Sequence, residues 1–326
     1  MRPSLPTPLR VAIVTPSPRG SRSGNRVTAL RWAGHLRRLG ARVRIMETWQ
    51  GPPCDLLVAV HAVKTAACVR QATAALPDLR VAVLLAGTDV YPQFAPDPEA
   101  AAALQRADVL IALQPRSADV LPAALRAKVR TIVQSATALP GRRQSSPFRF
   151  CVLAHLRPVK DPLLPLQALE HVPRDVRVEL VIAGRALSAE LAAAAAAAVA
   201  AEPRARWLGE VPRREARALL ASSHACIVPS AAEGGANVVS EAIAAGTPLL
   251  ATAIPGNLGL LGDDWPGLFP VGDAAGLGRL MTRAASDRDA YHDMIARTLA
   301  LQPMVDPRRE LSAWRALLAE LRLGPA

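Results

Sequence analysis

The sequence is poor in the residues that characterise several classes of binding protein. Aromatic residues make up 3% of the 326 residues, which argues against a surface on which single-stranded nucleic acid stacks. The four cysteines form no C-x-x-C pair and have no histidine cluster near them at metal-ligand spacing. They are Cys54, Cys68, Cys151 and Cys226. The last two lie in apolar runs, which favours reduced core residues over a catalytic thiol. We expect no metal site.

Long apolar runs are also missing. The longest, residues 191–201, is almost pure alanine and falls far short of the ~20 residues that a membrane span needs. A soluble helix that begins near Ser188 explains it better. Pro3, Pro6, Pro8 and Arg10 interrupt the N-terminal segment, so no secretion signal is predicted there. We expect a cytoplasmic protein with no membrane partner.

Lysine is scarce as well, although the chain is basic. Only Lys64, Lys128 and Lys160 contribute to the 39 Lys and Arg residues, and the net charge is +12. The excess of arginine, with abundant alanine and proline, indicates compositional bias. The surplus charge either meets phosphate groups or lies on a solvated surface. Because the chain has no zinc-finger spacing and no aromatic RNA-binding motif, nucleic acid is not an expected partner.

Short apolar runs typical of buried strands alternate with helical patterns along the whole chain, and hydrophobic residues reach 51%. In the first half these runs are 9–16, 41–47, 55–62, 81–87, 107–113 and 128–133. In the second half they are 148–156, 176–184, 205–210, 224–230 and 247–253. A segment rich in Pro, Gly, Ser and Arg, residues 139–147, separates the two series.

This alternation predicts an α/β protein with two Rossmann-like, doubly wound domains that face each other across a cleft, the ligand lying at the carboxyl ends of the strands. We expect an N-terminal domain over residues 1–143 and a C-terminal domain over 144–309. A C-terminal helix around Trp314, over residues 310–324, is expected to return to the first domain.

The most informative motif is P-S-A-A-E-G-G-A-N-V-V-S-E-A-I-A-A-G, residues 229–246. Gly234 and Gly235 allow a ligand to approach the backbone after a buried strand. The helix that begins near Ala236 and stops at Gly246 offers an N-terminus suited to a diphosphate. Glu233 lies in the loop, and Glu241, which we expect two turns into the helix, is suited to a ribose diol. The alternative is a plain turn followed by a solvated helix.

Four other loops follow predicted strands and carry candidate ligands. Arg157 and Lys160 come after the first strand of the second half, and they either stabilise a departing diphosphate or are solvated. In the first half, the loop 16–26 holds an anion pocket or a solvated turn. Its candidate residues are Arg19, Arg22, Gly24, Asn25 and Arg26, and the remaining candidates at strand ends are His61, Lys64, Thr88 and Asp89. His61 is a base, an anion ligand or a structural histidine; Asp89 accepts a proton, holds a sugar hydroxyl or caps a helix.

These motifs resemble known enzymes. The second half resembles GT-B glycosyltransferases of the glycogen-synthase and sucrose-synthase type, through Arg157, Lys160 and the E-x7-E pair Glu233 and Glu241. More narrowly, five segments resemble the selenosugar synthases of selenoneine biosynthesis. They are residues 24–40, 55–66, 84–91, 153–163 and 232–243. One difference is Val63, which stands where that family has a second basic residue beside Lys64.

The resemblance implies a GT-B fold and an enzyme that displaces UDP from a UDP-sugar, typically UDP-N-acetylglucosamine, with selenophosphate as nucleophile and no cofactor. It implies catalytic roles for Arg157, Lys160, Glu233 and His61. It implies a donor site at Gly234, Gly235, Ala236, Asn237, Val238 and Glu241, and an acceptor site at Arg22, Gly24, Asn25, Arg26, Lys64, Thr88 and Asp89. It also implies small-molecule substrates, and neighbouring enzymes that supply selenophosphate and form selenoneine. The alternatives are a glycosyltransferase with a hydroxyl acceptor and a nucleotide-sugar epimerase or phosphorylase.

Overall fold

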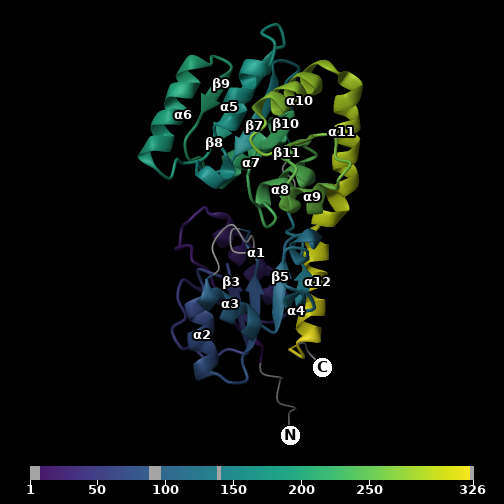
Figure 1. Cartoon of the computed structure of the whole chain (residues 1–326). Helices are drawn as coiled ribbons and strands as arrows, with labels where there is room; N and C mark the ends of the chain where they lie inside the picture. The colour runs from purple at the N-terminus through teal and green to yellow at the C-terminus, as the bar shows by residue number, and fades with distance from the viewer. Residues whose placement is uncertain (1–7, 88–96, 138–140, 324–326) are drawn as a thin grey trace. The chain divides into compact units, whose positions relative to one another are not determined.

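The computed structural model describes residues 8–87, 97–137 and 141–323, and the chain divides into two compact units (Figure 1). Unit 1 comprises residues 1–134 and 307–326, and unit 2 comprises residues 135–306. The chain therefore leaves unit 1 after Gln134 and returns to it at Pro307, whereas the sequence patterns placed these boundaries after residues 143 and 309. In unit 2 the two connecting segments are joined by a hydrogen bond from Ala136 N to Val305 O, at 3.0 Å.

Unit 1 is built on a parallel sheet of six strands. These are β1 (Arg10–Val14), β2 (Arg42–Met46), β3 (Leu56–Val60), β4 (Arg80–Leu84), β5 (Val109–Ala112) and β6 (Val129–Thr131). Their order is β2-β1-β3-β4-β5-β6, and every pairing is parallel. The chain goes from β1 outward to β2 and then back to β3 on the other side of β1, so the winding reverses between β1 and β3.

Helices cover both faces of this sheet. They are α1 (Gly24–Arg38), α2 (Ala66–Ala75), α3 (Pro98–Arg106), η1 (Pro115–Ala118), α4 (Ala123–Arg126) and α12 (Pro307–Glu320). One buried cluster joins alternate strand residues such as Ile13 to α1 and α12, and the other joins Val14 and its equivalents to α2 and α3. Since strands covered on both faces need apolar residues at every position, they read as continuous hydrophobic runs in the sequence.

The C-terminal helix α12 is attached to α1 through a buried carboxylate. Glu310 accepts hydrogen bonds from Trp32 Nε1 at 2.8 Å and from Arg31 Nε at 3.0 Å, and His35 Nε2 lies 3.1 Å from it. The indole rings of Trp32 and Trp314 meet edge to face, with centroids 5.0 Å apart. These contacts explain why a helix from the far end of the chain belongs to the first unit (yellow in Figure 1).

Unit 2 contains the second parallel sheet. Its strands are β7 (Phe148–Leu153), β8 (Val178–Ala183), β9 (Ala205–Trp207), β10 (Ala225–Val228), β11 (Leu249–Thr252) and β12 (Leu268–Phe269). They are arranged in the order β12-β11-β10-β7-β8-β9. This is the strand order of dinucleotide-binding Rossmann domains, in which the winding reverses at the centre of the sheet, here between β7 and β10.

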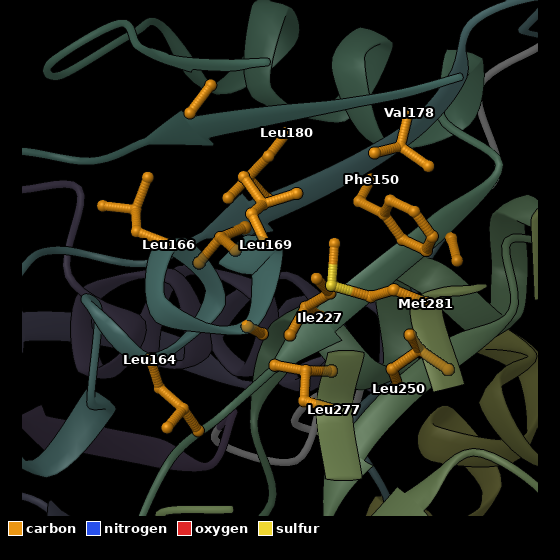
Figure 2. Close-up of a cluster of buried hydrophobic side chains, with 14 of the residues drawn as sticks. Phe150, Leu164, Leu166, Leu169, Val178, Leu180, Ile227, Leu250, Leu277 and Met281 are labelled. Atoms are coloured by element: carbon orange, nitrogen blue, oxygen red, sulfur yellow. The ribbon is translucent and has the colours of Figure 1, made fainter. Parts of the chain in front are cut away.

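The helices of unit 2 again lie on both faces of the sheet. They are η2 (Pro158–Lys160), α5 (Leu164–Ala168), η3 (Leu169–His171), α6 (Ala189–Ala201), α7 (Arg213–Ser222), α8 (Asn237–Ala245), α9 (Pro255–Leu261), α10 (Ala274–Ser286), α11 (Arg288–Leu301) and η4 (Gln302–Val305). Figure 2 shows the larger core, where Phe150 and Ile227 of the strands meet Leu164 of α5 and Leu277 and Met281 of α10. This packing fixes one face of β7 and β10.

The predicted α/β fold with two doubly wound units is confirmed. The poly-alanine helix begins after Ser188, whose side chain accepts a hydrogen bond from Leu191 N, as predicted. Helix α8 ends at Gly246, which has a φ of 65°. The C-terminal helix runs from Pro307 to Glu320, earlier at both ends than the expected 310–324. All four cysteines are free and buried.

Candidate functional site

In each unit, most of the predicted site residues follow the two strands between which the winding reverses. In unit 2, Lys160 follows β7 and Glu233 follows β10, and these strands are paired neighbours. In unit 1, Arg26 follows β1 and His61 follows β3, which are also paired. Connections that leave two adjacent strands in opposite directions open a crevice at their carboxyl ends, where α/β proteins bind their ligands. We describe the two sites separately.

In unit 2 the loops after β7 and β10 are joined by backbone and side chains. Ala231 N donates to Val159 O at 2.9 Å. The ammonium group of Lys160 forms an ion pair with Oε1 of Glu233, and the Ser230 hydroxyl donates to the same oxygen at 2.6 Å. Glu233 is buried, with a side chain 9% exposed. An ion pair at low exposure lies in a medium of reduced dielectric, so its two charges are held in a defined geometry.

The segment after Glu233 leads into helix α8. Gly235 has a φ of 135°, which favours glycine, and Ala236 is the N-cap. Ala236 supplies no side-chain cap within the described chain, so the first turn, with Asn237 and Val238, presents backbone N–H groups rather than a capping side chain. The positive end of the helix dipole and the backbone of Gly234 and Gly235 form an arrangement suited to a phosphate group.

Glu241 is the fifth residue of α8, just over one turn from its start. The expectation that it lies two turns into the helix is therefore wrong, since a turn takes 3.6 residues and the helix begins only at Asn237. Its carboxylate accepts a hydrogen bond from Arg213 Nη2, on α7, at 3.1 Å. The Glu241 side chain is 17% exposed and that of Arg213 is 55% exposed. Arg213 is a partner that the motif did not reveal.

Arg157 lies at the N-cap of η2, three residues before Lys160, and its side chain is exposed. The turn that holds both ends at Asp161, which has a left-handed backbone with φ 42°. Burial raises the pKa of the Asp161 carboxyl above its ordinary value. The structure thus brings Lys160 and Glu233 into contact, and it places Arg157 on the same short turn as Lys160.

In unit 1 the loop between β1 and α1 contains serine residues that are linked by hydrogen bonds. Ser23 is the N-cap and accepts a hydrogen bond from Arg26 N at 3.4 Å, while its hydroxyl donates to Ser17 Oγ at 2.6 Å. Ser23 N in turn donates to Ser21 Oγ at 3.2 Å. Gly24, Asn25 and Arg26 consequently form the first turn of this helix, whereas the sequence predicts a loop over residues 16–26.

His61 follows β3 directly and is 7% exposed. Its φ of 92° is unusual for a residue with a side chain, and Thr65 holds its carbonyl oxygen through the hydroxyl at 2.8 Å. The Lys64 backbone N–H lies 3.5 Å from the ring atom Nδ1 and donates to it. Strained backbone of this kind is concentrated at functional sites.

The cations of unit 1 differ from Lys160 in their surroundings. In the described part of the chain, the side chains of Arg26 and Lys64 have no carboxylate partner, and Lys64 is exposed. Arg22 is exposed in the loop before α1. Arg19 donates its backbone N–H to Glu47 at 3.1 Å, which places it at the outer part of the loop. Thr88 and Asp89 lie outside the described residues.

Sequence reasoning missed the polar groups that support these residues. Ser230, Arg213 and the hydroxyls of Ser17 and Ser21 all contact predicted site residues or their supports. Ser17 and Ser21 could have been noticed as a cluster in the 16–26 loop, whereas Arg213 is separated from Glu241 by 28 residues, including strand β10, and gives no local signal. In residues 8–87, 97–137 and 141–323, no group of His, Cys, Asp and Glu side chains is arranged to hold a metal ion.

Comparison with known proteins finds a family match in the second unit. Residues 140–299, which lie within unit 2, match the family model described as glycosyl transferases group 1. No curated protein matches the chain by sequence search. Among the described residues, none of the helices has both the length and the apolar character needed to cross a membrane.

Solved structures are similar to this chain over nearly its whole length. Anabaena Alr3699/HepE in complex with UDP and glucose is 16% identical, with a TM-score of 0.76, and the match covers 96% of this chain and 98% of that one. The sucrose-phosphate synthase of Thermosynechococcus elongatus is 16% identical, with a TM-score of 0.74 over 96% and 100% of the two chains. The pneumococcal O-GlcNAc transferase GtfA, in complex with UDP and GlcNAc, is 17% identical, with a TM-score of 0.68 over 82% and 57%. At this identity the likeness establishes the GT-B fold.

Proposed function

We propose that the protein transfers a sugar from a UDP-sugar, which unit 2 binds, to selenophosphate, which unit 1 binds. The observation that carries the first part is the contact between Lys160 and Glu233 at the carboxyl ends of β7 and β10, in a unit that matches the group 1 glycosyltransferase family model. The similar HepE structure contains UDP and glucose. A cation and a carboxylate side by side match the two ends of such a donor, a diphosphate and a sugar with hydroxyl groups.

The donor site works by exchanging partners. Lys160, with Arg157 on the same turn, moves its charge to the diphosphate, and the Glu233 carboxylate then accepts hydrogen bonds from hexose hydroxyls. The N-terminal turn of α8, from Gly234 to Val238, holds the diphosphate through backbone N–H groups. Glu241 accepts the hydrogen bonds of the ribose diol. As the bond to UDP breaks, Lys160 and Arg157 stabilise the negative charge that develops on the leaving group.

The acceptor site in unit 1 is suited to an anion. Arg26 and Lys64 bring positive charge without a carboxylate beside it, and the first turn of α1, with Gly24 and Asn25, brings backbone N–H groups. Arg22 adds a further cation, and in this proposal the His61 ring binds the anion. Thr88 and Asp89 remain candidates from the sequence. A neutral alcohol would leave these charges unused, whereas selenophosphate would bind all of them.

The reaction forms one bond to carbon and breaks another. A lone pair of selenium attacks the anomeric carbon of the UDP-sugar, while the bond from that carbon to the β-phosphate oxygen breaks and UDP leaves with the electron pair. The product is a sugar linked through selenium to phosphate, and water that cleaves the Se–P bond releases inorganic phosphate and a selenol sugar. Selenium is already a strong nucleophile, so positioning and leaving-group stabilisation are the main requirements. An enzyme that makes selenophosphate must supply the acceptor, and one that uses a selenol sugar must consume the product.

The second candidate is a glycosyltransferase that uses a hydroxyl acceptor. The strained, buried His61 favours it, since a histidine at a strand end is suited to remove the proton of an alcohol. In this case His61 would be a catalytic base, and the cations of unit 1 would serve only to attract the donor.

The test is a reaction of the purified protein with UDP-N-acetylglucosamine and, in parallel, other UDP-sugars, with and without selenophosphate. UDP and selenium-containing products are followed by mass spectrometry. We expect UDP release that depends on selenophosphate and a product that contains selenium. UDP release with alcohols but not with selenophosphate would favour the second candidate. Interconversion of UDP-sugars without an acceptor would indicate an epimerase, and no UDP release above background hydrolysis would overturn the proposal.

A further inference from the structure

Behind Glu233 lies a second set of polar contacts, which comes from the end of the neighbouring strand β11. Thr252 is the last residue of β11 and is completely buried. Its Oγ1 lies 2.6 Å from the carbonyl oxygen of Ser230, in the loop after β10. The Ser230 hydroxyl is the group that donates to the Glu233 carboxylate. Thr252 therefore holds, through its side chain, the residue that holds Glu233.

The direction of these hydrogen bonds is set by Asn257, on α9. Its Nδ2 donates to Thr252 O at 3.0 Å and to Thr252 Oγ1 at 3.2 Å. The carbonyl oxygen of Thr252 is only an acceptor, so the amide group that faces it must be Nδ2. Because Thr252 Oγ1 accepts from the amide, its own hydrogen is available for Ser230 O. The sequence of donors thus runs from Asn257 to Thr252 to Ser230.

A backbone contact acts on the same loop. Gly256, at the start of α9, lies so close to Glu233 that a Cβ atom at this position would collide with the Glu233 carbonyl oxygen and Cβ. The Thr252 hydroxyl therefore holds the loop after β10 through a hydrogen bond. The missing side chain at Gly256 lets α9 pack directly against the same loop. In Figure 1, β11 and α9 lie beside β10 and α8 in the green part of the chain.

We propose that Thr252, oriented by Asn257, is a positioning residue for Glu233, and that it determines how well the carboxylate meets the sugar rather than how tightly the nucleotide binds. This inference rests on the proposed function, in which Glu233 contacts the hexose. When the donor binds, Glu233 exchanges Lys160 for sugar hydroxyls, so its own ion pair no longer fixes it. The backbone of the loop then determines the position of the carboxylate, and a displacement of about 1 Å in such a group can cost ~100-fold in rate.

Thr247, just before the start of β11, offers a matched control for Thr252 at the end of this strand. Thr247, two residues before β11, is also completely buried, and its hydroxyl also donates to a backbone carbonyl, Leu220 O, at 3.0 Å. Leu220 belongs to α7, whereas Glu233 lies in the loop after β10. Thr252→Val and Thr247→Val therefore remove the same group from equally buried sites, but only the first change acts on the Glu233 loop.

The experiment measures kcat and KM for the UDP-sugar, the Kd of UDP alone and the thermal midpoint of wild type, T252V, T252S and T247V. We expect T252V to lower kcat by about tenfold with the Kd of UDP within twofold of wild type, since only the sugar end loses its alignment. T252S keeps the hydroxyl and should restore at least half of the wild-type kcat. T247V should lower the thermal midpoint about as much as T252V but leave kcat within twofold.

Equal effects of T252V and T247V on kcat, in protein that is folded, would overturn the inference. If T252V does not fold, Gly256→Ala and Gly267→Ala provide the same comparison. A Cβ at either glycine meets a backbone carbonyl oxygen, that of Glu233 in the first case and that of Leu249 in the second. We expect G256A, but not G267A, to reduce kcat while the Kd of UDP stays unchanged. Wild-type protein that releases no UDP from any UDP-sugar would instead contradict the proposed function, so the two failures are distinguishable.

Discussion

The two units have the same kind of sheet and place their candidate residues at the same topological position, but they hold charge differently. In unit 2 the Lys160 ammonium is paired with Glu233, and Glu241 is paired with Arg213. In unit 1, by contrast, Lys64 has no carboxylate partner within the described residues. At the proposed donor site two cations are held in ion pairs, whereas Arg26 and Lys64 at the proposed acceptor site have no carboxylate partner among the described residues.

This difference has consequences for binding. A ligand of unit 2 must replace an internal ion pair, so its affinity depends on how well it substitutes for both partners. A ligand of unit 1 neutralises charges that are otherwise only solvated, so binding there requires an anion and weakens as salt increases. The net charge of +12 is therefore less informative than the position of a few cations at strand ends.

The largest effect is expected from breaking the balanced pair. Lys160→Ala removes the cation that faces the leaving group and takes the ion-pair partner from the buried Glu233 carboxylate. We expect turnover to fall by about 10²–10³-fold, as for loss of one stabilising group at a developing negative charge. The control is Lys128→Ala in unit 1, since the Lys128 ammonium bonds only to carbonyl oxygens of Gln105 and Ala107. The turnover of both variants is measured as steady-state UDP release. Rates within threefold of each other would show that Lys160 is not part of the active site.

The second prediction concerns acid, because unit 2 also contains a strongly paired structural carboxylate. The Arg204 guanidinium lowers the pKa of Glu202 from 4.5 to about 2. A depressed pKa stabilises the folded state above pH 4.5, and this contribution disappears as the pH falls towards 2. It amounts to about 3 kcal/mol at neutral pH, of which roughly 2 kcal/mol is lost by pH 3.

Urea unfolding at pH 7 and pH 3 tests this prediction. Wild type should lose more free energy of unfolding between the two pH values than Glu202→Gln, which has no carboxylate to protonate. Asp55→Asn is the control in unit 1, where the Arg10 guanidinium lowers the pKa of an exposed carboxyl and the pair is worth little. If the Glu202→Gln variant and wild type show the same pH dependence, the carboxylate does not contribute as described.

More of the fold than of the two candidate sites could be predicted from the sequence. Apolar runs located the strands and Gly246 located the end of α8, because both signals depend on neighbouring residues in the sequence. The E-x7-E motif located Glu233 and Glu241 for the same reason. Their partners Ser230, Thr252 and Arg213 could not be found as such, since their contacts depend on the order of strands in the sheet and on helix packing. The start of α1 was also missed, because Ser23 caps it through a loop whose composition indicated only a turn.

The third prediction tests the excess charge of unit 1. Lys64→Ala and Arg26→Ala should each raise the KM for selenophosphate by about 10-fold or more, since a hydrogen bond to a charged group is worth ~1.5–3 kcal/mol. The Kd of UDP should not change. Arg38→Ala is the control, because Arg38 is an exposed arginine in the last turn of the same helix α1. Equal effects of all three variants would mean that the cations act only through net charge.

The smallest effect is expected at the exposed pair of unit 2. Arg213→Met removes the partner of Glu241 but leaves the carboxylate in place, and exposed ion pairs contribute only about 0.2–1 kcal/mol. We expect a two- to fivefold rise in the KM for the donor with kcat unchanged. Arg214→Met changes the neighbouring exposed arginine, for which the structure shows no ion pair among the described residues. A fall in kcat with R213M would show that Glu241 does more than bind the nucleotide.

The most direct test of the central claim is to identify the bond that the enzyme forms. The protein is mixed with selenophosphate enriched in selenium-77 and a UDP-sugar labelled with carbon-13 at its anomeric position, and the product is examined by NMR. The account predicts a one-bond coupling between the two labels, formed at the rate at which UDP appears. UDP release with the labelled carbon bonded only to oxygen would contradict it.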